Sequence, residues 1–125
     1  MDIRPAHYPG RAPIDSYGGG GFRFAGMSHR GSLLCLPDGI HGWPVFRPEE
    51  IDRESLAAVF AQAARIDVLL VGTGNDLVPL PRALKAALSE VRIVAEPMST
   101  GAAVRTFNVL LAEERAVAAA LIAVD

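Results

Sequence analysis

The sequence predicts an α/β domain in which antiparallel strands come first and strand–loop–helix units follow. The first third of the chain has short apolar or alternating runs separated by turn residues, a pattern typical of an antiparallel meander. From residue 67 onward, apolar strand-like runs alternate with helical patterns, which indicates parallel strands with helical crossovers. The 125 residues are 50% hydrophobic and 21% charged, so this is a globular chain long enough to bury a core.

Proline and glycine suggest how the chain is divided. Residues 1–13 hold three prolines and no hydrophobic period, which predicts an irregular N-terminal arm. No later linker is long enough to divide the chain, so we expect residues 14–125 to form a single α/β domain.

The predicted meander is organised around four consecutive glycines. Phe22 and Phe24 share one face of a strand by period two, and Arg23 lies on the other face. We expect strands at residues 14–17, 22–25 and 32–36, with turns at residues 18–21, 27–31 and 37–39.

Helix signals dominate the rest of the chain. Pro48 with two acidic residues after it favours a helix start, and Ser99 or Thr100 is a suitable N-cap for the longest helix. We expect strands at residues 41–45, 67–71, 91–95 and 117–124 and helices at residues 48–65, 81–90 and 99–114. The last strand follows its helix after almost no linker, which favours an antiparallel orientation. Helical spacing predicts buried positions at Leu56, Val59, Phe60, Ala63, Ala103, Phe107, Leu110 and Leu111.

Two loops form the candidate binding crevice. The strands at 67–71 and 91–95 are joined by a helix, so they should be parallel and their exit loops should leave the same edge, where α/β sheets bind ligands. The candidate residues are Gly72, Thr73, Gly74, Asn75, Met98, Ser99, Thr100, Arg105 and Asn108. Two alternatives stay open: the glycines only make a tight turn, and Arg105 and Asn108 only tie the adjacent loops together through backbone hydrogen bonds. In either role, we expect the side chains of Arg105 and Asn108 to point toward the exit loops at 72–75 and 97–100.

Catalytic, metal and cofactor motifs are missing from the sequence. Cys35 lies in an apolar run and is predicted to be a buried, inert thiol. The three histidines have no ligand-like spacing, and no serine lies in a nucleophile elbow, so we predict no catalytic residue, metal or cofactor. The net charge of -2 argues against nucleic acid as a partner. Without a signal peptide or a membrane span, the expected location is the cytoplasm.

The chain resembles a family of small α/β domains through one long motif and several short ones. The long motif combines Met98, Thr100, Ala102-Ala103, Arg105-Thr106, Asn108-Val109-Leu110 and Ala112-Glu113; the short ones are Tyr17-Gly18, Gly31-Ser32-Leu33-Leu34, Pro37, Trp43 and Leu69-Leu70-Val71-Gly72-Thr73-Gly74. The family includes a mitochondrial assembly factor of respiratory complex I, an adipogenesis-associated animal protein and many uncharacterised bacterial proteins. The resemblance implies a three-layer domain with a mixed central sheet and an additional antiparallel N-terminal β portion.

Departures from the family pattern bear on the crevice. Ser99 stands where the family usually has Asp, Phe107 where it often has Tyr, and Glu114 where Gly is usual. The first departure removes a carboxylate from the candidate crevice and weakens any acid–base role there.

Three functional hypotheses follow. The first is a non-catalytic binding or assembly-accessory domain with protein partners in respiratory-complex or membrane-protein biogenesis. The alternative is a small-ligand or anion-binding enzyme or sensor that uses the crevice. The third is a structural homo-oligomer with Trp43 and Phe46 at its interface, since the sequence leaves the oligomeric state open.

Overall fold

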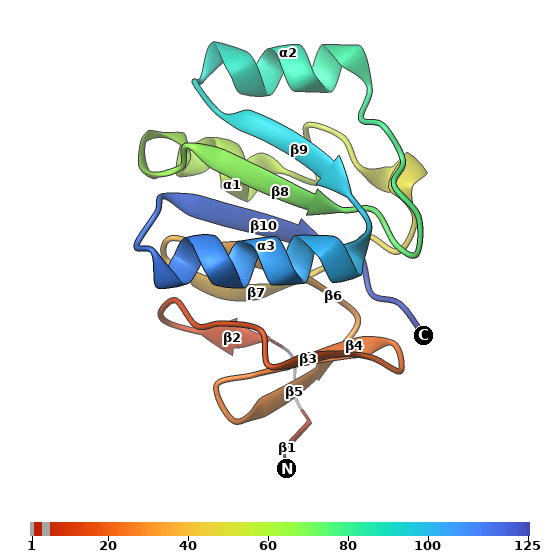
Figure 1. The fold of residues 1–125 in the computed structure, drawn as a ribbon. Helices are drawn as coiled ribbons and strands as arrows, with labels where there is room; N and C mark the ends of the chain where they lie inside the picture. Colours follow the sequence, from red (N-terminus) through yellow and green to blue (C-terminus); the bar gives the residue numbers. More distant parts are fainter. Residues whose placement is uncertain (1, 4–5) are drawn as a thin grey trace.

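A computed structural model describes residues 2–3 and 6–125 of the chain (Figure 1). The strands in these ranges are β1 (Asp2–Ile3), β2 (His7–Tyr8), β3 (Ser16–Gly18), β4 (Gly21–Phe24), β5 (Met27–Arg30), β6 (Ser32–Leu36), β7 (Gly39–Trp43), β8 (Val68–Gly72), β9 (Val94–Met98) and β10 (Val117–Leu121). The helices are α1 (Ala57–Ala61), α2 (Arg82–Glu90) and α3 (Thr100–Ala112), and two short 3-10 turns are η1 (Pro48–Glu50) and η2 (Ala63–Arg65).

The central sheet has the strand order β2-β7-β6-β10-β8-β9. Strands β10, β8 and β9 are parallel, and the other pairs are antiparallel, so the predicted mixed sheet is confirmed. The sequence predicts that the last strand is antiparallel to its neighbours. This is correct for β6 but wrong for β8, to which β10 is parallel. Helix α3 itself carries the chain back along the sheet, so no long linker is needed to start β10 in the direction of β8 and β9.

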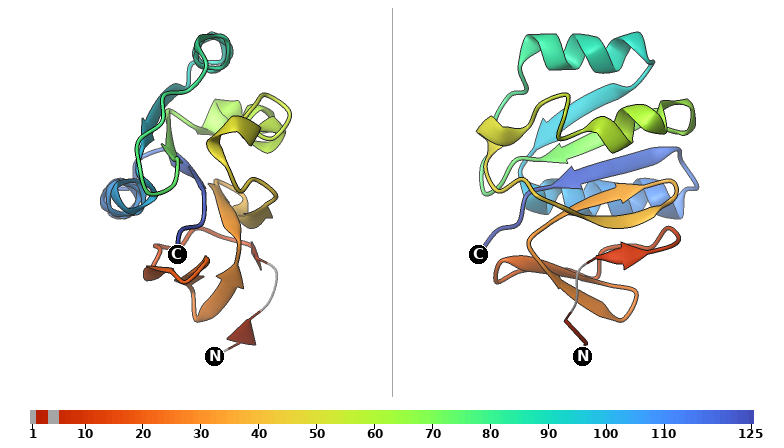
Figure 2. Two further views of the ribbon diagram at one scale, coloured as in Figure 1. Left: turned by 90° about the vertical axis from the view of Figure 1, so that its right-hand side faces the viewer. Right: turned by 180° about the vertical axis from the view of Figure 1, so that it is seen from behind.

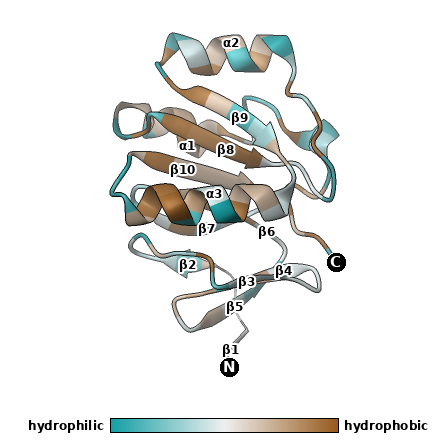
Figure 3. Ribbon diagram, viewed as in Figure 1, coloured by the Kyte–Doolittle hydropathy of each residue, from teal (hydrophilic) through white to brown (hydrophobic). Residues whose placement is uncertain are grey.

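Helices cover both faces of this sheet, and α3 lies on the face opposite α1 (Figure 2). The side chains of β10 alternate between two cores: Ala118 and Ala120 belong to the core that includes residues of α1 and α2, and Ala119 and Leu121 belong to the core that includes residues of α3 and the small sheet. Strands β8 and β10 are accordingly hydrophobic along their length (Figure 3). The predicted three-layer α/β architecture is therefore confirmed.

The predicted antiparallel N-terminal portion consists of β3, β4 and β5, which belong to a second sheet with the order β1-β5-β4-β3 in which β1 is parallel to β5. The prediction of a turn at residues 27–31 is wrong, because Met27–Arg30 is strand β5 and pairs with β4. The turn is two residues earlier: Ala25 and Gly26 have φ of 49° and 73°, the conformation of a tight two-residue hairpin. Pairing with β4 buries Met27 opposite Phe24, and this tertiary gain outweighs the turn propensity of the segment.

Two further segments differ from their sequence predictions. His7–Tyr8, in the arm expected to be irregular, is strand β2 and pairs with β7; Met1, Arg4 and Pro5 lie outside the described residues. The strand expected at 91–95 is β9, Val94–Met98, because Arg92 with φ of 65° makes the turn after α2. The division into an arm and a domain at residue 14 stays a prediction.

The helix expected at residues 48–65 is three short pieces, η1, α1 and η2. Asp52 and Ser55 interrupt it, because the Asp52 Oδ1 accepts from the Ser55 N–H at 2.7 Å and the Asp52 N–H donates to the Ser55 Oγ at 3.0 Å. Such local side-chain bonds compete with helical ones. Leu56 and Val59 are nevertheless buried as predicted.

The other two helices match the sequence prediction. Ser99 is the N-cap of α3, since its Oγ accepts from the Ala102 N–H at 3.3 Å. Ala103 and Phe107 are buried as expected, whereas Leu110 and Leu111 are half-buried. Trp43 belongs to the core, where its indole N–H donates to the Ser55 carbonyl at 2.8 Å, while Phe46 is 64% exposed.

His29 ties the two sheets together. Its Nδ1 accepts from the Ala6 N–H at 2.9 Å, so its Nε2 carries the proton that it donates to the Ser32 carbonyl at 3.2 Å. Ala6 precedes β2 and Ser32 begins β6, so one imidazole joins β5 of the small sheet to the large sheet.

We predict that H29A lowers the free energy of unfolding by about 1–3 kcal/mol, because two backbone groups lose their partner. Urea denaturation measures the change. H29Q is the control: its amide can accept from one group and donate to the other, so it should recover part of the loss. Wild-type stability of H29A would show that this link contributes nothing.

Candidate functional site

The strand-end residues predicted to form a crevice are instead joined directly to one another. Thr73 is 3% exposed, and its N–H donates to the Met98 carbonyl at 2.9 Å. Its Oγ1 donates to the Asp76 carbonyl at 2.6 Å and accepts from the Val78 N–H at 2.9 Å. The loop after β8 is thus folded around the Thr73 hydroxyl. Asn75 of this loop is exposed.

Thr100 is fully buried and is joined to the same loop. We call Thr73, Gly74 and Thr100 the strand-end junction. The Thr100 Oγ1 donates to the Ile122 carbonyl at 2.7 Å and accepts from the Gly74 N–H at 3.1 Å, and its own N–H donates to the Gly74 carbonyl at 2.8 Å. A Cβ on Gly72 would lie 2.9 Å from the Thr100 Cα, so the start of α3 rests directly on the end of β8. These residues connect three segments of chain; the ligand-binding role that the sequence predicts for them stays a prediction.

Asn108 does not point toward the exit loops, so that part of the prediction is wrong. Its Oδ1 accepts from the Ile14 N–H and its Nδ2 donates to the Ile14 carbonyl, both at 2.8 Å. Asn108 lies eight residues after Thr100, which at 1.5 Å per residue is about 12 Å along the helix, too far from the loops at its start. The alternative of a backbone tie is correct in kind, but the segment that it holds is the one before β3.

Arg105 behaves differently from Asn108. It is exposed and has no hydrogen bond or ion pair among the described residues. The Tyr17 hydroxyl lies against Gly101, where a Cβ would collide with it, and the Arg105 Nη1 is 3.5 Å from the same position. Glycine at position 101 therefore lets β3 of the small sheet approach α3.

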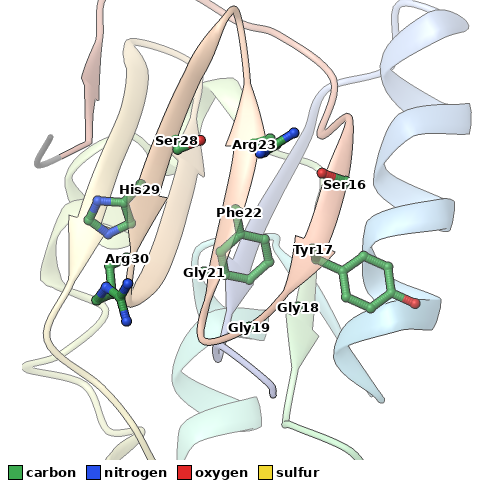
Figure 4. A pocket seen from close by; sticks show the side chains of 10 residues that line it. All are labelled: Ser16, Tyr17, Gly18, Gly19, Gly21, Phe22, Arg23, Ser28, His29 and Arg30. Atoms are coloured by element: carbon green, nitrogen blue, oxygen red, sulfur yellow. The ribbon is translucent and has the colours of Figure 1, made fainter. Parts of the chain in front are cut away.

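An open polar hollow of about 170 Å³ lies on the small sheet (Figure 4). The register of β3, β4 and β5 aligns the residues of the hollow in rows across the three strands. Tyr17 extends from β3 toward α3 (Figure 4). The lining residues of the hollow are Ser16, Tyr17, Gly18, Gly19, Gly21, Phe22, Arg23, Ser28, His29 and Arg30.

Two arginines give the hollow its charge. Arg23 pairs with Ser28 and Arg30 pairs with Gly21, so the two arginines lie two positions apart on neighbouring strands and share one face. Both are exposed, and neither has an ion pair or hydrogen bond among the described residues. The sequence pattern places Arg23 on the strand face opposite Phe22 and Phe24, but it does not identify Arg30, because it predicts a turn at residues 27–31.

Cys35 and Asp38 have pKa values that are shifted by their local surroundings. Burial raises the pKa of the Cys35 thiol to about 12, which keeps it protonated and unreactive. A hydrogen bond from His41 lowers the pKa of the exposed Asp38 carboxyl, and the His41 Nε2 lies 2.9 Å from the Asp38 Oδ1. In the part of the chain that the structure describes, no group of three His, Cys, Asp or Glu side chains could hold a metal ion. No helix among the described residues has the length and apolar character needed to cross a membrane.

We predict that N108A lowers the free energy of unfolding by about 1–3 kcal/mol, because the Ile14 N–H and carbonyl lose their partners. R105A should change it by less than about 0.5 kcal/mol, since the side chain is exposed and has no partner. Chemical denaturation of both variants checks this, with the exposed Val109 changed to Ala as a helix control. Equal losses in N108A and R105A would contradict the structural distinction between them.

We predict that Cys35 reacts with a thiol-specific disulfide reagent only when the protein unfolds. Its raised pKa leaves almost no thiolate at pH 8, and the side chain is 1% exposed. The absorbance of the released thiolate, followed with and without 6 M guanidinium chloride, measures both rates. Rapid reaction of the folded protein would show that the thiol is accessible.

Comparison with known proteins places these features in a family. The family described as protein of unknown function DUF498/DUF598 matches residues 14–122. An uncharacterised protein of Rhodobacter capsulatus is 44% identical over 122 residues, which are 98% of this chain and 93% of that protein. NADH dehydrogenase (ubiquinone) 1 alpha subcomplex assembly factor 3 of Mus musculus is 33% identical over 98% of this chain; the chain spans 66% of that protein's length.

A solved structure shows the same fold. The crystal structure of a protein of Bartonella henselae, described as an outer membrane protein, is 58% identical with a TM-score of 0.92, and the match covers 95% of this chain and 100% of that one. The family match over most of the chain and the 33% identity to an assembly factor agree with the resemblance noted in the sequence. The chain belongs to the DUF498/DUF598 family, whose members include uncharacterised bacterial proteins and complex I assembly factor 3.

Proposed function

We propose that this domain is a non-catalytic accessory that binds protein partners during the assembly of a membrane-associated respiratory complex. The observation that carries the proposal is the similarity to complex I assembly factor 3, which extends over 98% of the chain. The similarity therefore includes the small sheet and α3 as well as the central strands. The name of this relative describes its own role; the transfer of that role to this chain is the proposal.

The hydrogen bonds of the family motif support a structural use of its polar residues. Thr100 holds Gly74 and Ile122, and Asn108 holds Ile14. Side chains that are bound within the domain are not available to activate a substrate. The alternative, a small-ligand enzyme or sensor at the strand ends, has less support because Thr100 packs against Gly72 and fills that place.

The proposal includes a location and a partner class. We place the domain in the cytoplasm, where the predicted free thiol of Cys35 is compatible with the reducing environment. Its partners are proteins rather than nucleic acid, since a net charge of -2 provides no overall attraction to phosphate backbones.

We predict that affinity capture of the tagged full chain from the source cell recovers subunits of a respiratory complex or of its assembly machinery. Deleting its gene should reduce the amount of assembled complex on native gels without reducing the transcripts of its subunits. The control is a strain complemented with the wild-type chain. Normal amounts of assembled complex in the deletion strain, together with turnover of a metabolite by the purified protein, would refute the proposal.

A further inference from the structure

We propose that the hollow on the small sheet, flanked by Arg23 and Arg30, is the docking point for an acidic segment of a protein partner. This inference rests on the proposed function, because it assigns a surface and a chemistry to the partner. The segment supplies carboxylates that pair with the two guanidinium groups. The strand-end junction takes no part in it.

The first support is the unpaired state of both arginines. Guanidinium groups present forked donors that match carboxylate oxygens in a bidentate geometry. Arg23 and Arg30 are diagonal neighbours on one face, so their Cα atoms are about 7–8 Å apart and their side chains can converge on one acidic stretch. Two like charges held this close without a carboxylate repel each other, and an incoming anion relieves that repulsion.

The second support is the open surface next to the arginines, on the side of β3 and of the turn that follows it. A Cβ on Gly18 or on Gly19 would meet nothing within 4 Å, so these positions are open and lack the side chains that would fill the hollow. Ser16 adds a hydroxyl from the same face of the sheet as Arg23. The hollow therefore combines room, hydrogen-bonding groups and positive charge.

The third support distinguishes a protein segment from a small free anion. The hollow is open and has about 170 Å³, below the roughly 300–1,000 Å³ of pockets that enclose small ligands. Both arginines of the hollow are exposed, and arginine is enriched in protein–protein interfaces; Tyr17 lies on the other face of the sheet, since it pairs with Phe22. Exposed ion pairs are individually weak, so useful affinity requires several carboxylates on one chain.

The test uses the full chain and a tetraglutamate peptide as the probe, followed by amide NMR spectra at constant ionic strength. We expect saturable shifts confined to residues 16–31. R23Q/R30Q should raise Kd about fivefold to tenfold. The matched control R82Q/K85Q removes the same charge from the exposed surface of α2, at the opposite end of the molecule, and should leave Kd unchanged (Figure 1).

Three results would overturn the proposal. Shifts spread over the whole surface, or an equal loss in both double variants, would mean only general charge attraction. Inorganic phosphate or tetraglutamine binding at residues 16–31 as tightly as tetraglutamate would exclude recognition of an acidic segment. Absence of saturable shifts would mean that the hollow does not bind the probe.

Partner capture separates failure of this proposal from failure of the proposed function. If R23Q/R30Q captures the same respiratory partners as wild type, the hollow is not the docking point, although the assembly role stands. If the wild-type chain captures none of them but binds tetraglutamate through Arg23 and Arg30, the site is supported and the assembly role is not.

Discussion

The position of β10 at the centre of the main sheet is the constraint on which the rest of the fold depends. This strand is the last in the chain, and all five of its residues are buried. It joins the antiparallel half of the sheet through β6 to the parallel half through β8. Three of its residues are alanines, whose small side chains let α3 pack closely against the strand. Neither half of the sheet, nor either helical layer, has a complete core until the chain has closed on this strand.

Two polar side chains of α3 fix that closure from one helix. Thr100 binds the residue that follows β10 and the loop that follows β8, so it sets where the two parallel strands end. Asn108, two turns later, holds Ile14 in the way that a strand would, since it both donates and accepts. Leaving such buried groups unpaired is costly, and the cost makes the relative positions of helix, sheet and N-terminal segment specific. The family motif is thus explained largely as a set of structural hydrogen bonds.

The sequence predicted the parts of the fold that local pattern determines. The apolar run of β8, the cap at Ser99 and the buried pair Ala103 and Phe107 follow from periodicity and capping. The failures occur where tertiary pairing or a local side-chain bond decides. The composition of residues 27–30 favours a turn, but the segment gains burial by pairing with β4. The hydrogen bonds between Asp52 and Ser55 interrupt a helix that the spacing of apolar residues favours. The direction of Asn108 could not be predicted, because its partner Ile14 is 94 residues away in the sequence.

The missed strand and the missed site have the same cause. Arg30 lies on the same face as Arg23 only because Met27–Arg30 is a strand in register with β4. If Arg30 were in a turn, its position relative to Arg23 would not be fixed by strand pairing. The same meander needs glycines at its β3–β4 turn, and these also leave the surface beside the arginines uncovered. Chain geometry and surface chemistry are therefore coupled in this sheet. The polar groups of Thr73 and Thr100 at the strand ends are bound internally, whereas the guanidinium groups of Arg23 and Arg30 have no partner among the described residues, so the small sheet has the free hydrogen-bond donors that the strand ends lack.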